Sequence, residues 1–252
     1  MFQLTTASLR LIYIIAAFFS FCVPASAEAA FRQADPFPTV IMGYLDFPPL
    51  MWDEGGTPKG SLIDLTKEIA KDQGLAIEFV YRPVKRLYTD LARGDIHLWI
   101  GSPDTTEIKG KVLFMDPPVV VAQLKLYARK GRSIPAFEDL RNTSLIIING
   151  YRYGGLWTEL NDPARSLSFL PAMNHETALG MLSAGRADFV LDYSRPTNKL
   201  NPQEIVGEFN ERLVQAFPSY YNVSKKAPRA QELVERLYIG LKNMQYASQA
   251  AE

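Results

Sequence analysis

The sequence predicts an α/β protein built from two lobes. Short apolar runs of strand length alternate along the chain with amphipathic segments of helical period, the pattern of strands covered by helices. A second observation points to two related halves: residues 91–100 and 182–191 each contain the end of a predicted helix, a glycine and a buried strand. Because such units occur in any α/β protein, this similarity between the two segments is by itself only weak evidence for two related lobes.

The elements expected in the first half follow one another in strand–helix order. They are strands at 39–44, 76–81 and 96–100, a helix between Ser61 and Gly74, and a helix between Pro83 and Gly94. Ser61 can cap the first helix, whose apolar stripe is Leu62, Leu65 and Ile69, and a glycine can end each helix.

The elements expected in the second half begin with a strand that leaves the first lobe. They are strands at 122–128, 144–148 and 219–223, a helical turn at 137–140, and helices that start at Asn174 and Pro228. Asn174 is a good N-terminal cap, and proline suits the first turn of a helix. We expect the last helix to pack back on the first lobe, which gives two crossings between the lobes and hence a hinge. The predicted lobe 1 is 38–121 with 217–252, and the predicted lobe 2 is 122–216.

Residues 1–27 have the three parts of a secretory signal peptide. Arg10 is the only charged residue, an apolar run of about 13 residues begins at Leu11, and Ala25-Ser26-Ala27 is a cleavage site. An uncleaved anchor is the alternative, but a membrane-spanning helix needs about 20 apolar residues. We therefore expect cleavage after Ala27 and a periplasmic protein. The single cysteine, Cys22, leaves with the signal, so no disulfide is expected.

The composition argues against several kinds of partner. Lys+Arg and Asp+Glu number 27 each and no basic run occurs, so we expect neither nucleic acid nor a membrane surface to bind. The two histidines, His97 and His175, lie in different predicted lobes and lack the spacing of metal ligands. We expect no metal, no cofactor and a monomer.

Several short motifs occur in a fixed order along the chain. They are the aromatic and Pro-Pro segment 44–52, the segment 60–65 (Gly-Ser-Leu-Ile-Asp-Leu), the segment 91–94 (Leu-Ala-Arg-Gly), the stretches 101–107 and 112–118, and the segment 185–188 (Gly-Arg-Ala-Asp). Together they resemble the motifs of the family 3 periplasmic solute-binding proteins, best known as amino-acid receptors of ABC transporters. The resemblance covers residues 38–246 and implies a two-lobed, periplasmic-binding-protein-like fold of type II with a ligand cleft between the lobes.

One position departs from the family pattern in a way that bears on the ligand. Thr105 matches the Thr of a T-x-x-R motif, but Ile108 stands where the family has an Arg. A guanidinium pairs with a carboxylate through two charge-assisted hydrogen bonds, which an aliphatic side chain cannot make. Either the ligand lacks an α-carboxylate, or another cation holds it; Arg152 is the first candidate, ahead of Lys109 and Arg86.

The resemblance and the residue pattern nominate one set of ligand-binding residues. They are Tyr44, Phe47, Trp52, Gly101, Ser102, Thr105, Tyr151, Arg152, Tyr153, Asp192 and Tyr193. Asp192 lies about one position out of register with the family's ligand-amine Asp. Segment 104–107 also reads as a capping box, which predicts a helix whose N–H groups face the cleft. The structural alternatives are that Phe47 and Trp52 only cover a lobe surface, and that 151–153 is an ordinary solvated loop.

The leading functional prediction is a non-enzymatic receptor that closes on a small polar ligand and delivers it to an inner-membrane permease. One alternative is a sensor or accessory protein that contacts a membrane receptor instead. Another is an enzyme, because a few relatives of this fold are exported dehydratases acting on carboxylated cyclohexadienyl compounds. The chain has no recognisable acid/base pair for such a reaction.

Overall fold

A computed structural model of the protein describes residues 35–194, 196 and 209–249. The elements described below lie in the compact unit Phe37–Glu252. The predicted signal peptide at 1–27 lies outside the described residues, as do short stretches of both predicted lobes.

A large mixed sheet runs through this unit, in which the strands follow the order β4-β1-β5-β11-β7-β10-β8-β9 and β6 also pairs with β11. The strands are β1 (Val40–Tyr44), β4 (Ile77–Tyr81), β5 (Leu98–Gly101), β6 (Val112–Phe114), β7 (Val120–Arg129), β8 (Ser144–Ile148), β9 (Ser168–Ala172), β10 (Phe189–Tyr193) and β11 (Phe209–Ser224). A separate hairpin is made by β2 (Trp52–Glu54) and β3 (Thr57–Lys59). The predicted α/β class is confirmed.

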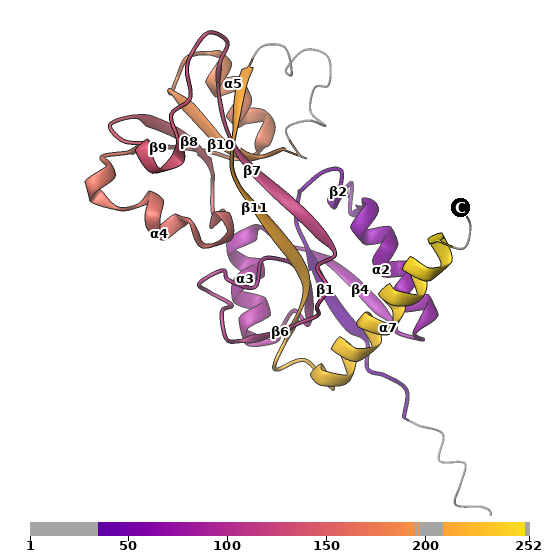
Figure 1. Ribbon diagram of the computed structural model, residues 1–252. Helices are drawn as coiled ribbons and strands as arrows, with labels where there is room; N and C mark the ends of the chain where they lie inside the picture. The colour runs from indigo at the N-terminus through magenta and orange to yellow at the C-terminus, as the bar shows by residue number, and fades with distance from the viewer. Residues whose placement is uncertain (1–34, 195, 197–208, 250–252) are drawn as a thin grey trace, which may run out of the picture. The chain divides into compact units, whose positions relative to one another are not determined.

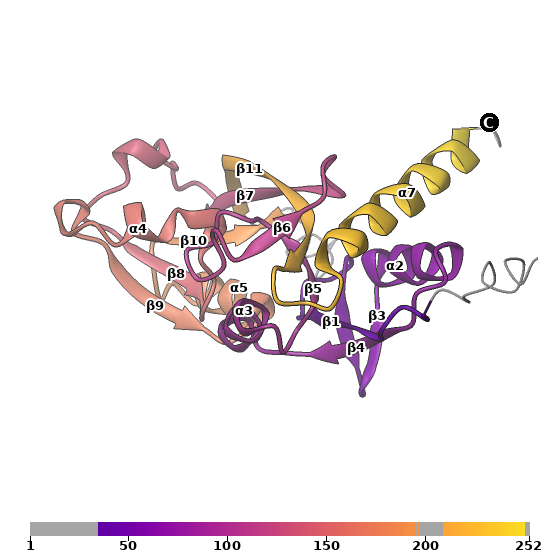
Figure 2. The ribbon, with the colours of Figure 1, turned by 90° about the horizontal axis from the view of Figure 1, so that it is seen from below.

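The first group of strands is β1, β4 and β5, which are parallel. Helices α2 (Ser61–Asp72) and α7 (Ala230–Gln249) lie side by side on one face, and α3 (Val84–Arg93) lies on the other (Figures 1 and 2). Successive residues of β5 point to opposite faces: Leu98 is buried with α2 and α7, and Trp99 with α3. The predicted packing of the last helix on the first lobe is therefore confirmed.

The second group is β8, β9 and β10, also parallel, and it has a core of its own. Helix α5 (His175–Ser183) covers one face, where Ile146, Ala178 and Leu182 are buried together. The other face buries Leu145 and Leu160 with short elements. These are η2 (Phe137–Asp139), η3 (Tyr153–Gly155), α4 (Trp157–Leu160) and η4 (Pro163–Arg165).

The antiparallel strands β7 and β11 join the two groups (Figure 1). Residues Phe209 to Ser219 of β11 pair with β7, and Tyr220 to Val223 pair with β5, so one strand belongs to both groups. The register shifts between Leu213 and Gln215, which marks a bulge. The fold is thus two-lobed; the exact residues at which the lobes divide stay a prediction.

Helix boundaries differ from expectation at two N-termini and agree at a third. Gly60 holds the cap position of α2, because its φ of 118° suits glycine, and Ser61 is the first helical residue. Helix α7 begins at Ala230, two residues beyond the expected Pro228. Asn174 caps α5 as predicted, since its side chain accepts a hydrogen bond from the N–H of Thr177.

The capping-box prediction at 104–107 is wrong. The segment that follows β5 forms successive turns and no helix. The N–H groups of Ile108 and Lys109 both donate to the carbonyl of Thr105, which closes one turn. No helix N-terminus therefore faces the cleft from this segment.

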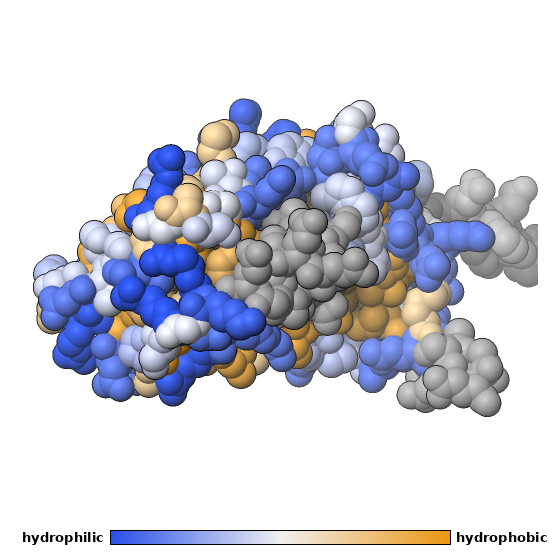
Figure 3. Space-filling model, turned by 90° about the horizontal axis from the view of Figure 1, so that it is seen from above, coloured by the Kyte–Doolittle hydropathy of each residue, from blue (hydrophilic) through white to orange (hydrophobic). Residues whose placement is uncertain are grey.

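The surface seen in Figure 3 is largely hydrophilic, with apolar residues in scattered patches. The most exposed large apolar side chains include Met173 at 87% and Leu213 at 54%. In the described part of the chain, no helix combines the length and apolar character that crossing a membrane requires.

Candidate ligand-binding site

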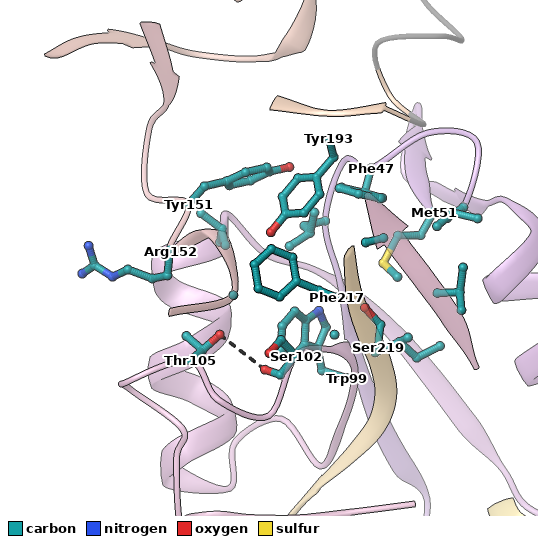
Figure 4. A pocket seen from close by; sticks show the side chains of 18 of the residues that line it. Phe47, Met51, Trp99, Ser102, Thr105, Tyr151, Arg152, Tyr193, Phe217 and Ser219 are labelled. Atoms are coloured by element: carbon teal, nitrogen blue, oxygen red, sulfur yellow. Dashed lines mark hydrogen bonds between the residues drawn. The ribbon is translucent and has the colours of Figure 1, made fainter. Parts of the chain in front are cut away.

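A cavity of about 80 Å³ lies where the carboxyl ends of strands from both groups meet, the usual ligand position in open α/β sheets (Figure 4). Its lining comes from the loops after β1, β5 and β8, from β5 itself, from helices α2 and α3, and from the end of β10, the start of β7 and the middle of β11. Most of the predicted ligand residues line it: Phe47, Gly101, Ser102, Thr105, Tyr151, Arg152, Tyr153 and Tyr193. Whether they contact a ligand stays a prediction.

Three predicted residues do not line this cavity. Tyr44 is buried inside the first lobe, where its hydroxyl donates to Asp53 at 2.6 Å. Trp52 lies in the β2–β3 hairpin opposite Lys59. Asp192 is fully buried behind the cavity, with both carboxylate oxygens within 2.9 Å of His175 Nδ1.

Several lining residues were missed by the sequence reasoning, among them Leu45, Tyr88, Trp99, Phe217 and Ser219. Trp99 could have been found from the sequence, since it is an aromatic residue two positions before the motif at 101–107, in the apolar run 96–100. Phe217 could not, because its place depends on the unpredicted length of β11.

Aromatic rings from both lobes form one wall of the cavity (Figure 4). Tyr193 contacts Phe47 edge-on at 5.3 Å between ring centroids, and it stacks on Tyr153 at 6.2 Å. Tyr151 lies 6.0 Å from Tyr193. Burial raises the pKa of Tyr151, Tyr153 and Tyr193, so the three phenols are neutral at ordinary pH.

Arg152, the expected anion anchor, directs its guanidinium away from the aromatic wall (Figure 4). Its Nε donates to Glu107 Oε1 at 2.6 Å, and the guanidinium carbon lies 6.0 Å from the ring of Trp157. Ile108 is fully buried in the apolar cluster beneath α3. Neither residue offers an unmatched cation to the cavity.

A buried chain of hydrogen bonds runs behind the wall from Asp192 through His175 to Tyr151. The hydroxyl of Tyr151 lies 3.2 Å from His175 Nε2 and also donates to the carbonyl of Asp46 at 3.4 Å. Burial lowers the pKa of His175, but the charge and hydrogen bond of Asp192, with the Asp46 carbonyl, outweigh it and raise the pKa above the usual 6.5. Since Asp46 belongs to the loop after β1 and His175 to α5, the chain ties the lobes together.

The polar and aromatic groups that line the cavity are tyrosine and phenylalanine rings, hydroxyl groups and the indole of Trp99. Arg152 is the only charged side chain among the described residues that line it. Within the described ranges, no group of three or more His, Cys, Asp or Glu side chains is arranged to hold a metal ion. Such a surface suits binding through shape, stacking and single hydrogen bonds.

One curated protein is similar to this chain over part of its own length. The membrane-bound lytic murein transglycosylase F of Idiomarina loihiensis is 21% identical over 175 residues, which are 68% of this chain but 38% of that protein. The chain thus spans well under half the length of that relative.

Solved structures share the fold over most of the chain. A histidine kinase sensor domain with similarity to periplasmic binding proteins matches with a TM-score of 0.70 and 22% identity, over 85% of this chain and 93% of that chain. A mutant of ArgBP from T. maritima matches with a TM-score of 0.68 and 24% identity, over 84% of this chain and 91% of that chain. Identities this low establish the fold alone.

The family follows from a match along nearly the whole described chain. The sequence profile of the bacterial extracellular solute-binding proteins, family 3, matches residues 40–251, which include both strand groups and every residue that lines the cavity. The chain therefore belongs to the bacterial extracellular solute-binding proteins of family 3.

Proposed function

We propose that this protein is an exported, periplasmic receptor that closes on a small molecule and presents it to a membrane permease. The observation that carries the proposal is the mixed lining of the cavity. Trp99 and Ser102 come from the first lobe, and Tyr151 and Tyr193 come from the second. A molecule that touches both sides is bound more tightly by the closed state and shifts the population toward it.

Two polar contacts between the lobes support closure as the binding mechanism. Glu107 pairs with Arg152 at 2.6 Å, and Tyr151 donates to the carbonyl of Asp46. Both contacts lie beside the cavity and join the loops that would separate if the lobes opened. The strand pair β7 and β11 is the natural place for the hinge, since it connects the two groups.

The ligand we propose is not a standard amino acid held by its two charges. Ile108 replaces the carboxylate-binding Arg and is buried. Asp192 lies near the position of the amine-binding Asp, but its carboxylate is hydrogen-bonded to His175. Its neighbour Tyr193 lines the cavity instead. No catalytic step is proposed, because the described lining offers no carboxylate or imidazole to move a proton.

Calorimetric titration of the protein lacking residues 1–27 tests this function, with a broad panel of amino acids, peptides, organic acids and neutral metabolites. We expect saturable binding that is lost in Tyr193→Ala and kept in the matched surface variant Tyr238→Ala, since Tyr238 is 41% exposed on α7. X-ray scattering of the same samples should show a smaller radius of gyration with ligand. Absence of binding across the panel would reject the proposal.

A sensor or accessory role is the second candidate, supported by the similarity to a histidine kinase sensor domain. Such a protein would use the closed shape to contact a membrane receptor. Crosslinking in intact cells with and without ligand distinguishes the two functions. A transport protein would be crosslinked to a permease, and a sensor or accessory protein to a membrane receptor.

A further inference from the structure

Trp99 carries a buried donor that the fold leaves unsatisfied. The residue is 6% exposed and lines the cavity. Among the residues that the structure describes, none accepts a hydrogen bond from its indole Nε1–H. A buried N–H without an acceptor costs about 1–3 kcal/mol, so proteins rarely leave one without a reason.

The orientation of this indole is fixed by its neighbours. Tyr88 meets the ring edge-on, with centroids 5.3 Å apart and an interplanar angle of 77°. The six-membered end of the indole lies directly over Gly101, where a Cβ would be only 2.1 Å from Cη2. The ring nitrogen is then directed toward the side of the cavity where Phe217 and Ser219 lie (Figure 4).

The surroundings of this donor disfavour a charged ligand. The guanidinium of Arg152 is matched by Glu107, and the carboxylate of Asp192 is matched by His175. No other charged side chain lines the cavity in the described part of the protein. Burying an ion without a partner is far more costly than burying a neutral group of the same shape.

We infer that the cavity takes an uncharged, flat and largely apolar molecule that accepts one hydrogen bond from Trp99 Nε1–H. The inference rests on the proposed solute-binding function and names its ligand class. The aromatic wall supplies ring contacts at the other side of the molecule. The indole donor then orients it, since a single acceptor at the Trp99 side satisfies the only fully buried donor without a partner among the described residues of this lining.

Nuclear magnetic resonance of the indole N–H groups tests this inference directly. The chain has 3 tryptophans, so a ¹⁵N-labelled sample gives a small set of indole signals, assigned with Trp99→Phe and Trp157→Phe. Four probes that share a phenyl ring separate charge from hydrogen bonding: benzamide (neutral with an acceptor), toluene (neutral without one), benzoate and L-phenylalanine. We expect benzamide to bind at least about tenfold more tightly than benzoate or phenylalanine, and to move the Trp99 indole proton downfield.

The variant Trp99→Phe keeps an aromatic ring and removes the donor. It should weaken benzamide binding by about tenfold and toluene binding by much less, whereas Trp157→Phe, outside the cavity lining, should change neither. Circular dichroism of both variants checks that they fold. Equal loss of benzamide and toluene in Trp99→Phe would mean that the ring and not the donor matters, which overturns the inference.

The remaining outcomes distinguish the ligand class from the function itself. Tighter binding of benzoate or phenylalanine than of benzamide overturns the ligand class and leaves the solute-binding function in place. Absence of binding by all four probes also overturns the ligand class. The solute-binding function is rejected only if no compound of the full metabolite panel changes the same indole signals.

Discussion

Glu107 and Arg152 face each other across the cleft, with Glu107 Oε1 2.6 Å from Arg152 Nε. Glu107 comes from the turns after β5 and Arg152 from the loop after β8, so the pair joins one lobe to the other. The side chain of Arg152 is 29% exposed and that of Glu107 is 31% exposed, so solvent screens this contact less than the ion pairs of the outer surface. The expected ligand anchor is thus engaged by the protein itself.

We predict that this pair stabilises the closed arrangement by about 1 kcal/mol, between the values of exposed and buried pairs. Urea unfolding of Glu107→Gln, Arg152→Gln and the double variant measures the coupling free energy. The exposed pair Asp104–Lys109, at 3.6 Å, is the matched control and should give roughly 0–0.5 kcal/mol. A coupling at Glu107–Arg152 no larger than the control would contradict the prediction.

Placing an arginine at position 108 should not restore amino-acid binding. Ile108 is fully buried in the cluster that contains Leu87 and Leu91, so Ile108→Arg puts a charge into an apolar core. We expect the free energy of unfolding to fall by about 3 kcal/mol or more, whereas Ile108→Val should cost about 1 kcal/mol. Thermal unfolding and arginine titration check both points; a stable variant that binds arginine would refute the expectation.

The His175–Asp192 pair should make stability depend on pH. The pKa of His175 is raised above 6.5, so its contribution is fully present below pH 6.5 and is lost as the pH rises through the raised value. We therefore expect the difference in unfolding free energy between the native protein and His175→Gln to be largest near about pH 5 and to shrink toward about pH 9. Asp192→Asn serves as the control, since it removes the charge that raises the pKa. A difference in unfolding free energy that grows as the pH rises would contradict the prediction.

Tyr153 should matter for stability beyond its place in the cavity wall. Its buried hydroxyl accepts a hydrogen bond from the N–H of Ile148 at 2.7 Å. Tyr153→Phe leaves that N–H without an acceptor, and we expect a loss of about 1–3 kcal/mol in unfolding free energy. Tyr238→Phe, on the exposed side of α7, should stay within about 0.5 kcal/mol of the native protein. Denaturant unfolding of the two variants gives the comparison.

Much of the fold could be predicted because its signals are local. The strands β1, β4, β5 and β8 are apolar runs, and Gly94 and Asn174 mark helix ends through their own backbone and side-chain properties. The full length of β11 could not be predicted, since half of residues 209–216 are polar without a strict alternation, and the segment becomes a strand through pairing with β7. Long-range pairing of this kind leaves no periodic trace in the sequence.

The loops of the cavity could be predicted, but not the direction of each side chain. Phe47, which the resemblance indicated, lines the cavity, and so do Tyr151 and Tyr193, which the residue pattern at the strand ends indicated. Asp192 and Arg152 carry charges that find partners from distant segments, His175 and Glu107. Those partners are 17 and 45 residues away in the sequence, so no motif could reveal that the charges were already matched.

The bare backbone at Gly101 has a consequence for how the binding site of this protein can diverge. Its φ is not in the left-handed region, so alanine is conformationally acceptable there, and the nearest atoms that an added Cβ would meet belong to the indole of Trp99. One added methyl would swing that ring away and redirect the N–H, while every other side chain around the cavity kept its identity. We therefore expect a single substitution at residue 101, a position whose own side chain provides no functional group, to change the selectivity of the binding site.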